Sequence, residues 1–374
     1  MRICFIASPG IHTNPWLKYF ADNGHEVHLI TTESSRGSTD NVKLHLLKRF
    51  GPRIRIINYL VNSIPLMLQF KRLIKNINPD IIHAHSIMDT TLLGVVSGFH
   101  PFVVTPWGSD VLIVPKQSKF SRWMVRYVLK KVDLIACDGE HMMEPLIELG
   151  AEPQKIKLTY FGVDTQKFKP GQKNERLRKE LGILNSPTII SLRRLNPIYD
   201  IESLIKAVPL VLKEVPEAKF LLVEKGSQEA QLRQLAKSLG VSDSVKFAGL
   251  VPHDELPQYL ASADIYVSTS LSDAGLAAST AEAMACGLPV IITDFGDNRK
   301  WVEDGVNGFV IPLRAPEVLA SKIIYLLQNE DSRKKFGQAN HQMIEERDNW
   351  EKEMGKMGKL YEELIIAGGC KADV

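Results

Sequence analysis

Short apolar runs alternate along most of the chain with segments whose apolar residues recur at helical spacing. The runs predict buried strands, and they read RICFIAS, EVHLIT, DIIHAH, FVVTP, LIACD, TIISL, KFLLV, VKFAG, DIYVST and PVIIT. The helical spacing covers residues 12–23, 66–78, 120–131, 200–215, 227–239 and 278–286. Repeated strand–helix–strand order predicts an α/β fold with doubly wound parallel sheets covered by helices on both faces.

The pattern lapses between residues 166 and 186, where Lys, Pro, Gly and polar residues dominate. A chain of 374 residues can bury two cores. We therefore expect a Rossmann-like domain over residues 1–165, a linker over 166–186 and a second Rossmann-like domain over 187–348. Residues 349–374 are expected to form a helix that crosses back to the first domain. Two such halves would make a cleft between the carboxyl ends of their sheets, where ligands bind in these folds.

Composition narrows the class of protein. The hydrophobic share of 44% and the charged share of 24% are typical of a folded soluble chain. The four cysteines are scattered without metal-ligand spacing, which favours a reducing compartment and no disulfide framework. No run approaches the ~20 apolar residues of a membrane span. We expect a cytoplasmic protein with no nucleic-acid partner.

Basic residues gather in the first half of the chain. Residues 41–79 hold eight Lys or Arg and no acid, and residues 116–131 hold six and no acid. The second stretch places an apolar face beside a basic face at helical spacing; the apolar face consists of Phe120, Trp123, Met124, Tyr127 and Val128, and the basic face of Lys119, Arg122, Arg126 and Lys130. This pattern is typical of a helix at an anionic membrane surface, and equally of a packed helix with a solvated basic face.

The first strand is followed by the turn Ser8–His12, which contains Gly10. A glycine there lets a ligand approach the backbone, and free N–H groups at a helix start attract anions. A simple tight turn explains the same residues. The turn is not GxGxxG, which disfavours a dinucleotide-binding enzyme.

The segment SLSDAGLAASTAEAMACGLPVIITD, residues 270–294, predicts a loop, a helix and a strand. Glu282 lies between apolar neighbours in this helix, so its carboxylate needs partners. A ribose diol offers two hydroxyl donors, although a buried structural glutamate is the other interpretation. Small and polar groups precede Glu282 near the helix N-terminus, an end that favours phosphates; they are Ser272, Asp273, Gly275 and Ser279.

The stretch EAMACGLPV resembles the signature of the retaining glycosyltransferases of GT-B type, in the large family four group. Further stretches agree in order and spacing; they are SPGIHTNPWLKYFADNGHEVHLIT, VVTPWGSD, LTYFGVDTQKFKP, SLRRLNPIYDIESLIKA, FAGLVPHDELPQYLASADIYVSTS and DGVNGFVIP. The resemblance covers nearly the whole chain. It implies a GT-B fold, in which two Rossmann-like domains face a cleft.

The resemblance also implies roles for individual residues. Glu282 resembles the glutamate that holds the nucleotide ribose, and Arg194 the arginine that contacts the donor diphosphate. Gly10 belongs to the loop next to the phosphates and the acceptor. Gly249 to Val251 would line the base pocket through backbone groups.

Three positions depart from the family pattern. The glutamate that contacts the transferred sugar is replaced by Ala274, so Asp273 is the candidate substitute. The second phosphate cation is replaced by Tyr199, which leaves Arg193 or Lys225 as candidates. A histidine that many members carry before the glycine of VVTPWGSD is Trp107 here. Asp110, and His83 or His85 after the preceding strand, become candidates for acceptor contact, unless the histidines are structural.

These residues predict transfer of a hexose-type sugar from a UDP- or GDP-sugar to a glycan or lipid-linked acceptor. Arg194 and helix N–H groups would stabilise the leaving diphosphate. No DxD pair or His/Asp cluster indicates a metal, so no cofactor is expected beyond the nucleotide-sugar donor. The resemblance implies retention of anomeric configuration. The alternatives are a catalytically impaired nucleotide-sugar-binding protein and a sugar-nucleotide epimerase of the same fold.

Overall fold

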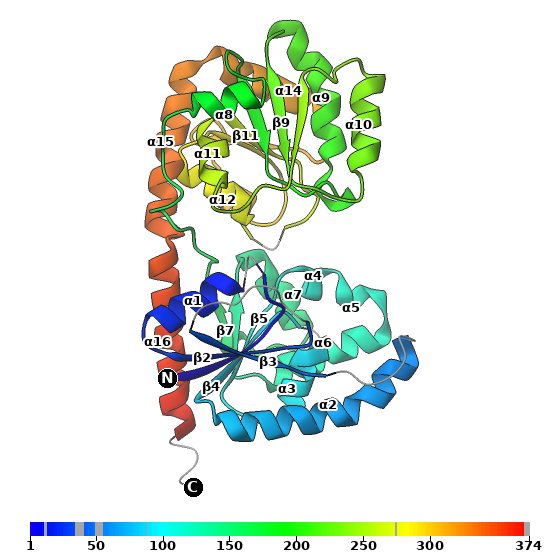
Figure 1. Ribbon diagram of the computed structural model, residues 1–374, viewed down its shortest axis with the longest axis vertical. Helices are drawn as coiled ribbons and strands as arrows, with labels where there is room; N and C mark the ends of the chain where they lie inside the picture. Colours follow the sequence, from blue (N-terminus) through cyan, green and yellow to red (C-terminus); the bar gives the residue numbers. More distant parts are fainter. Residues whose placement is uncertain (11–12, 34–40, 49–54, 88, 274, 370–374) are drawn as a thin grey trace. The chain divides into compact units, whose positions relative to one another are not determined.

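The computed structural model describes residues 1–10, 13–33, 41–48, 55–87, 89–273 and 275–369. The chain divides into two compact units (Figure 1). Met1–Tyr160 and Met354–Val374 form the first unit, and Phe161–Glu353 forms the second. Both units consist of a parallel sheet with helices on its faces, so the predicted fold class is confirmed.

The first unit contains a seven-stranded parallel sheet of order β3-β2-β1-β4-β5-β6-β7. Its strands are β1 (Arg2–Ile6), β2 (Glu26–Thr31), β3 (Val42–Leu46), β4 (Ile81–His85), β5 (Phe102–Thr105), β6 (Leu134–Cys137) and β7 (Ile156–Leu158). Its helices are α1 (Asn14–Asp22), α2 (Arg55–Ile77), α3 (Asp89–Val96), α4 (Ser109–Leu112), α5 (Val114–Gln117), α6 (Lys119–Lys131) and α7 (Met143–Glu148). The central strands β1, β4, β5 and β6 are almost wholly buried, as expected for a sheet covered on both faces.

The second unit contains a six-stranded parallel sheet of order β10-β9-β8-β11-β12-β13. Its strands are β8 (Thr188–Ser191), β9 (Lys219–Val223), β10 (Val245–Gly249), β11 (Ile265–Ser268), β12 (Val290–Thr293) and β13 (Gly308–Ile311). Its helices are α8 (Glu175–Glu180), α9 (Ile201–Glu214), α10 (Glu229–Ser238), α11 (Leu256–Ala261), α12 (Ala278–Ala285), α13 (Asn298–Trp301), α14 (Pro316–Gln328) and α15 (Glu330–Arg347). Helices α9, α10 and α14 cover one face, and α12 packs with α15 on the other (Figure 1).

Each sheet reverses its strand order once. The reversal lies between β1 and β4 in the first unit and between β8 and β11 in the second. Chain segments that leave the carboxyl ends of such neighbouring strands run in opposite directions and leave room for a ligand. Both sets of predicted site residues follow these strands or their neighbours.

The stretch predicted as a linker, residues 166–186, belongs to the second unit. It contains α8, which Asn174 caps by accepting a hydrogen bond from the N–H of Leu177. Arg178 of α8 is buried, and its guanidinium donates to the backbone carbonyls of Ser262, Leu184 and Ser186. This side chain ties the segment to the end of α11 and to the residues just before β8.

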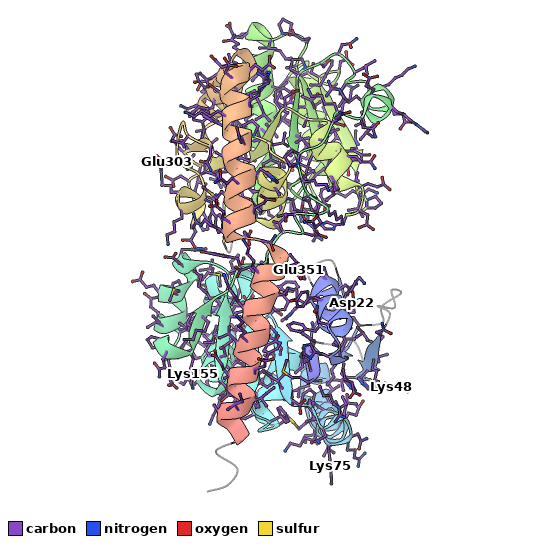
Figure 2. All side chains as sticks on the ribbon, turned by 90° about the vertical axis from the view of Figure 1, so that its left-hand side faces the viewer. Asp22, Lys48, Lys75, Lys155, Glu303 and Glu351 are labelled. Carbon is purple, nitrogen blue, oxygen red and sulfur yellow. The ribbon has the colours of Figure 1, made fainter. Side chains whose placement is uncertain are left out.

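The C-terminal helix α16 (Trp350–Gly369) joins the first unit from Met354 onward. Figure 2 turns this helix toward the viewer, with Glu351 labelled near its beginning. Tyr361 is fully buried against Phe20 of α1, at a ring distance of 5.2 Å. The Tyr361 hydroxyl also contacts Nδ1 of His83, whose Nε2 lies 2.7 Å from the Thr105 hydroxyl. The helix therefore supplies part of the core of the first unit.

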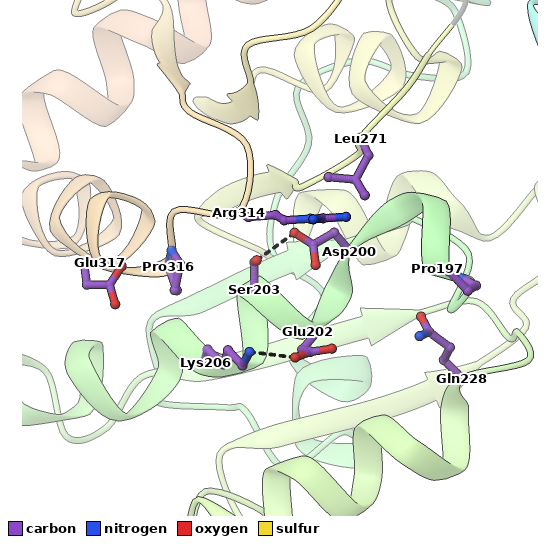
Figure 3. A pocket seen from close by; sticks show the side chains of 10 residues that line it. All are labelled: Pro197, Asp200, Glu202, Ser203, Lys206, Gln228, Leu271, Arg314, Pro316 and Glu317. Carbon is purple, nitrogen blue, oxygen red and sulfur yellow. Dashed lines mark hydrogen bonds and ion pairs between the residues drawn. The ribbon is translucent and has the colours of Figure 1, made fainter. Parts of the chain in front are cut away.

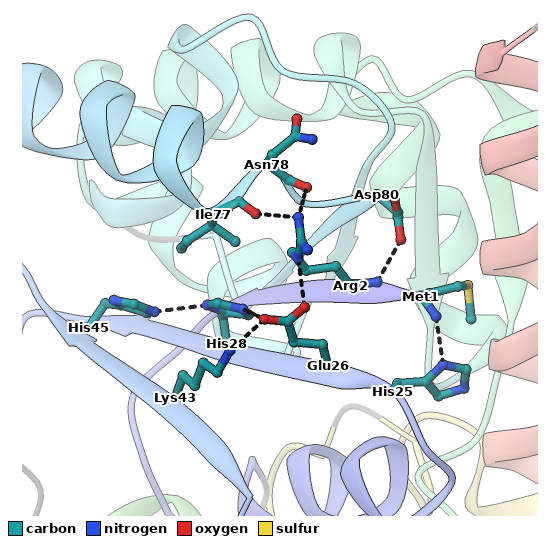
Figure 4. Close-up of polar contacts among 10 residues, drawn as sticks. All are labelled: Met1, Arg2, His25, Glu26, His28, Lys43, His45, Ile77, Asn78 and Asp80. Atoms are coloured by element: carbon teal, nitrogen blue, oxygen red, sulfur yellow. Dashed lines mark hydrogen bonds and ion pairs between the residues drawn. The ribbon is translucent and has the colours of Figure 1, made fainter.

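Polar side chains connect β1, β2 and β3 at one edge of the first sheet (Figure 4). Glu26 accepts hydrogen bonds from Lys43 and Arg2, and these contacts lower the pKa of its carboxyl to about 2. His28 lies 3.2 Å from Glu26 through Nε2 and 2.9 Å from His45 through Nδ1. Burial lowers the pKa of both histidines, because the charged imidazolium loses its hydration there.

Candidate active site

The segment after β8 carries two arginines with different surroundings. The buried Arg193 pairs with Asp273, donates to Ser270 at 2.8 Å and to Ser279 at 3.2 Å, and lies over the Tyr199 ring at 4.4 Å. These contacts bridge β8 to the segment after β11, across the point where the strand order reverses. Arg193 therefore has a structural role, because its contacts hold these segments of the site together.

Arg194 differs from its neighbour because its side chain is exposed. Among the described residues, none forms a hydrogen bond or ion pair with its guanidinium. Its charge is therefore available to a bound anion at the carboxyl end of the sheet. The sequence proposed Arg193 or Lys225 as the second cation; the geometry favours Lys225, which is exposed like Arg194.

Lys225 follows β9 and lies next to two neighbouring segments. Its carbonyl accepts a hydrogen bond from the Leu195 N–H at 3.2 Å, which joins it to the Arg194 segment. A Cβ on Gly226 would lie 2.2 Å from the Leu195 carbonyl oxygen, so only glycine allows this approach. On the other side, a Cβ on Gly249 would lie 3.5 Å from Cε of Lys225. Segments after β8, β9 and β10 therefore converge at one place.

The segment after β10 has the backbone form expected of a pocket lining. Gly249 has a φ of 75°, which favours glycine, and its carbonyl accepts from the Glu224 N–H at 2.7 Å. Leu250 is 64% exposed and Val251 is half-buried, so this backbone reaches the surface.

Glu282 lies on α12 with 13% of its side chain exposed. Its Oε1 is 2.7 Å from Nε2 of His253, in the segment between β10 and α11. Nδ1 of His253 is 3.0 Å from Nζ of Lys167, which also pairs with Asp254 at 2.7 Å. Sequence reasoning missed His253 and Lys167. The available signal was the position of His253, two residues after Val251.

Asp273 and Gly275 lie between β11 and α12. Asp273 has 13% of its side chain exposed and pairs with the Arg193 guanidinium. Gly275 is described as part of the same loop, whereas Ala274 lies outside the described residues. The carboxylate proposed to contact the transferred sugar is thus held by a buried arginine.

In the first unit, Gly10 and His85 lie near each other through Thr13. A Cβ on Gly10 would meet nothing within 4 Å, and the Gly10 carbonyl accepts from the N–H groups of Thr13 and Asn14. Nδ1 of the buried His85 is 3.4 Å from the Thr13 hydroxyl, and its ring contacts Trp16 edge-on at 5.0 Å. Ile11 and His12 lie outside the described residues.

Asp110 is buried at the start of α4. One carboxylate oxygen accepts from the Trp107 N–H at 2.9 Å, and the other from the Ile87 N–H at 2.8 Å. Burial raises the pKa of Asp110 to about 6, against the opposing effect of these hydrogen bonds. Asp110 therefore joins the segments after β4 and β5 through its two carboxylate oxygens. His83, the other histidine considered, is enclosed by Tyr361 and Thr105.

A cavity of about 610 Å³ opens in the second unit near the beginnings of α9 and α14 (Figure 3). Asp200, Glu202 and Lys206 line one side, and Arg314 and Glu317 the other. None of the predicted site residues lines it. We place the candidate site at the carboxyl end of the second sheet, where the segments of Arg194, Lys225 and Gly249 meet and where His253, in the segment after Gly249, contacts Glu282.

Only part of the apolar face predicted for α6 is buried in the structure. Met124 and Val128 are buried in the first unit. Phe120 and Trp123 are 52% and 53% exposed, and their stacked rings lie 5.8 Å apart. Tyr127 stacks on Trp123 at 5.5 Å. The helix thus offers an aromatic surface beside its lysines and arginines.

Among the residues that the structure describes, no group of three or more His, Cys, Asp or Glu side chains is placed to hold a metal ion. None of the described helices is both long enough and apolar enough to span a membrane.

Comparison with known families and proteins gives consistent matches along the chain. The family model of glycosyl transferases group 1 matches residues 173–343, and that of glycosyl transferase 4-like proteins matches residues 2–139. The chain is 26% identical to the Bacillus subtilis glycosyltransferase EpsD over 90% of both chains. It is 31% identical to the GDP-mannose-dependent alpha-(1-6)-phosphatidylinositol monomannoside mannosyltransferase of Mycobacterium tuberculosis over 51% of both chains.

A solved structure has the same fold. The Anabaena protein HepE, in complex with UDP-glucose, matches with a TM-score of 0.83 at 21% identity, over 97% of this chain and all of that chain. Both Rossmann-like units are therefore shared with a protein whose structure contains a nucleotide sugar.

Proposed function

This chain belongs to the glycosyl transferases group 1 family and is a nucleotide-sugar-dependent enzyme of the GT-B fold, and on that premise we propose that it transfers a hexose-type sugar to a glycan or lipid-linked acceptor. Two observations carry the proposal. The segments of the exposed Arg194 and Lys225 meet at the hydrogen bond from the Leu195 N–H to the Lys225 carbonyl, and the half-buried Glu282 is joined through His253 to the segment that follows Gly249. Two cations suit a diphosphate, and a carboxylate with two acceptor oxygens suits a ribose diol.

The donor is a UDP- or GDP-sugar in this proposal. HepE was solved with UDP-glucose, and the mycobacterial relative is named for GDP-mannose. Gly249 to Val251 would hold the base through backbone groups, which suits either nucleotide. A thermal-shift series with UDP-, GDP- and ADP-sugars tests the choice, because a ligand that binds only the folded state raises the melting temperature according to its affinity.

The chemistry follows from the charge that develops on the leaving diphosphate. Arg194 and Lys225 would stabilise that charge, so we propose a metal-independent reaction. Two buried carboxylates are already engaged: Asp273 with Arg193, and Asp110 with backbone N–H groups. Their engagement argues against either of them as an enzyme nucleophile. With the retention that the family resemblance implies, we propose that the acceptor attacks from the leaving-group side and the departing phosphate takes its proton.

Replacement of Arg194 by Ala tests the diphosphate assignment. Loss of one donor of this kind costs on the order of 10²–10³ in kcat. Arg176→Ala is the control, since Arg176 is an exposed arginine of the same unit that pairs with Glu180. Sugar release and transfer should fall in the first variant and persist in the second. Near-normal turnover of Arg194→Ala would remove the phosphate role.

We also propose peripheral contact of α6 with an anionic membrane, which would bring the enzyme to a lipid-linked acceptor. The exposed Phe120 and Trp123 suit the interfacial region, and Lys119 and Arg122 suit acidic headgroups. Co-sedimentation with vesicles containing anionic lipid should exceed that with neutral vesicles. It should fall in Trp123→Ala, whereas Tyr325→Ala removes an aromatic of the second unit that is 43% exposed and should have no effect. Equal partition onto both vesicles would contradict the electrostatic part.

A further inference from the structure

We propose that His253 and Lys167 are positioning residues that fix the Glu282 carboxylate for recognition of the nucleotide ribose. The inference rests on the proposed function, in which Glu282 accepts hydrogen bonds from the sugar hydroxyls of the donor nucleotide. It adds two residues to that site and assigns them a measurable property, namely discrimination between ribose and 2′-deoxyribose.

The contacts join three separate segments of the second unit. Lys167 precedes α8, His253 lies between β10 and α11, and Glu282 lies on α12. Nζ of Lys167 is 3.0 Å from Nδ1 of His253, and Nε2 of His253 is 2.7 Å from Oε1 of Glu282. The buried Phe168 lies against the imidazole, with ring centroids 5.2 Å apart. Packing and hydrogen bonding thus hold the ring in one orientation.

The order of the partners determines where the imidazole proton lies. An ammonium group has three donors and no acceptor, so Nδ1 of His253 must accept from Lys167. The proton of the neutral ring is then on Nε2, which donates to Glu282. Lys167 thereby selects the tautomer that can orient the carboxylate.

The arrangement leaves one face of Glu282 for a ligand. Oε1 accepts from His253, while within the described part of the chain no side chain donates to Oε2. A carboxylate fixed through one oxygen presents the other in a defined direction, and 13% of the Glu282 side chain remains exposed. A carboxylate without this hydrogen bond could rotate and would recognise the two ribose hydroxyls less selectively.

The test compares the affinities of UDP and 2′-deoxy-UDP by titration calorimetry, with GDP and 2′-deoxy-GDP as the second pair. A site built around a hydroxyl penalises the analogue that lacks it. We expect the wild type to favour the ribonucleotide by about tenfold or more. His253→Ala and Lys167→Met should bring the ratio of affinities toward one. His253→Gln should restore much of it, because the amide can donate to Glu282.

Lys173→Met is the matched control. Lys173 belongs to the same segment as Lys167, but it pairs with Asp264 at 2.6 Å. Its removal should leave the ratio of affinities unchanged. Circular dichroism and melting temperature identify variants that fail to fold, and His253→Gln keeps the test valid if His253→Ala is one of them.

The outcomes separate this inference from the proposed function. If the wild type does not discriminate, or Glu282→Ala keeps the full ratio, Glu282 does not bind ribose, and the ribose assignment of the proposed function fails together with this inference. If Glu282→Ala loses the ratio while His253→Ala keeps it, only the positioning role is overturned. An equal loss of affinity for both nucleotides in His253→Ala would show a structural role and would also overturn it.

Discussion

At the scale of single residues, the site depends on polar side chains that are held by other polar side chains. Arg193 contacts Asp273, Ser270 and Ser279, so one guanidinium ties the segments after β8 and β11 and the first turn of α12. Its neighbour Arg194 remains exposed. The two adjacent arginines thus differ in role: Arg193 holds the segments of the site together, and Arg194 is available to bind a ligand.

Replacement of Arg193 by Met should destabilise the second unit by about 3–5 kcal/mol, because it breaks a buried ion pair from one side. Urea unfolding should show this loss, with Arg176→Met as the exposed control. Arg193→Lys should recover only part of it, since an ammonium group cannot make the same fork of hydrogen bonds. Unchanged stability with lost turnover would instead show that Arg193 acts on the substrate.

We expect Asp110 to make the free energy of unfolding depend on pH. Its pKa in the folded chain is about 6, above the usual 3.8, so the folded state favours the protonated form. The protonated Asp110 carboxyl therefore stabilises the folded state fully below about pH 4, and this stabilisation is lost as the pH rises through about 6. It amounts to about 3 kcal/mol at most. Asp110→Asn should flatten this part of the curve of unfolding free energy against pH. A variant curve parallel to that of the wild type would contradict the assignment.

Part of the site could be predicted from sequence, because local motifs carry it. Glu282 stands out as an acid among apolar helix residues, and Arg194 follows a buried strand. The partners of Glu282 could not be predicted in this way. His253 is 29 residues away and Lys167 is 86 residues from His253, and their meeting depends on how three segments pack.

At the scale of elements, the strands that coincide with continuous apolar runs were predictable, whereas β3, β7 and β13 were not. Strand β3 alternates polar and apolar residues at the edge of its sheet, and its Leu44 and Leu46 are 48% and 47% exposed, so no apolar run identifies it. Strand β7 has three residues, and β13 begins at Gly308, which is a poor strand former. Pairing with neighbouring strands creates these elements, and pairing is invisible in a local pattern.

The edge formed by β2 and β3 should weaken in acid. The pKa values of His28 and His45 are below the usual 6.5, so stability from these groups is present above that pH and is lost as the pH falls through the lower folded values. Glu26 opposes the effect at His28, whereas Lys43 and Arg2 reinforce it. The melting temperature should fall as the pH drops below about 6.5, and His45→Gln should reduce that fall. An identical fall in the variant would exclude the histidine pair as its source.

At the scale of the whole molecule, the first unit is built from two distant parts of the chain. The chain leaves this unit at Tyr160 and returns at Met354. Met354, Met357 and Tyr361 of α16 are all buried in it. Deletion of α16 would therefore remove core side chains from a unit whose strands, β1 to β7, all lie before residue 160.

Variants of Tyr361 measure how far the stability of the first unit depends on α16. Tyr361→Phe keeps the ring against Phe20 but leaves Nδ1 of the buried His83 without the hydroxyl, which should cost about 1–3 kcal/mol. Tyr361→Ala also opens a cavity and should cost about 3–5 kcal/mol. Tyr325→Phe is the control, since that hydroxyl is exposed in the second unit. Unfolding followed by hydrogen exchange should show the loss in β1, β4 and β5 and leave β8 and β11 unchanged. If protection in the first sheet persists after Tyr361→Ala, α16 packs on a unit that is stable without it, and the core extends no further than residue 160.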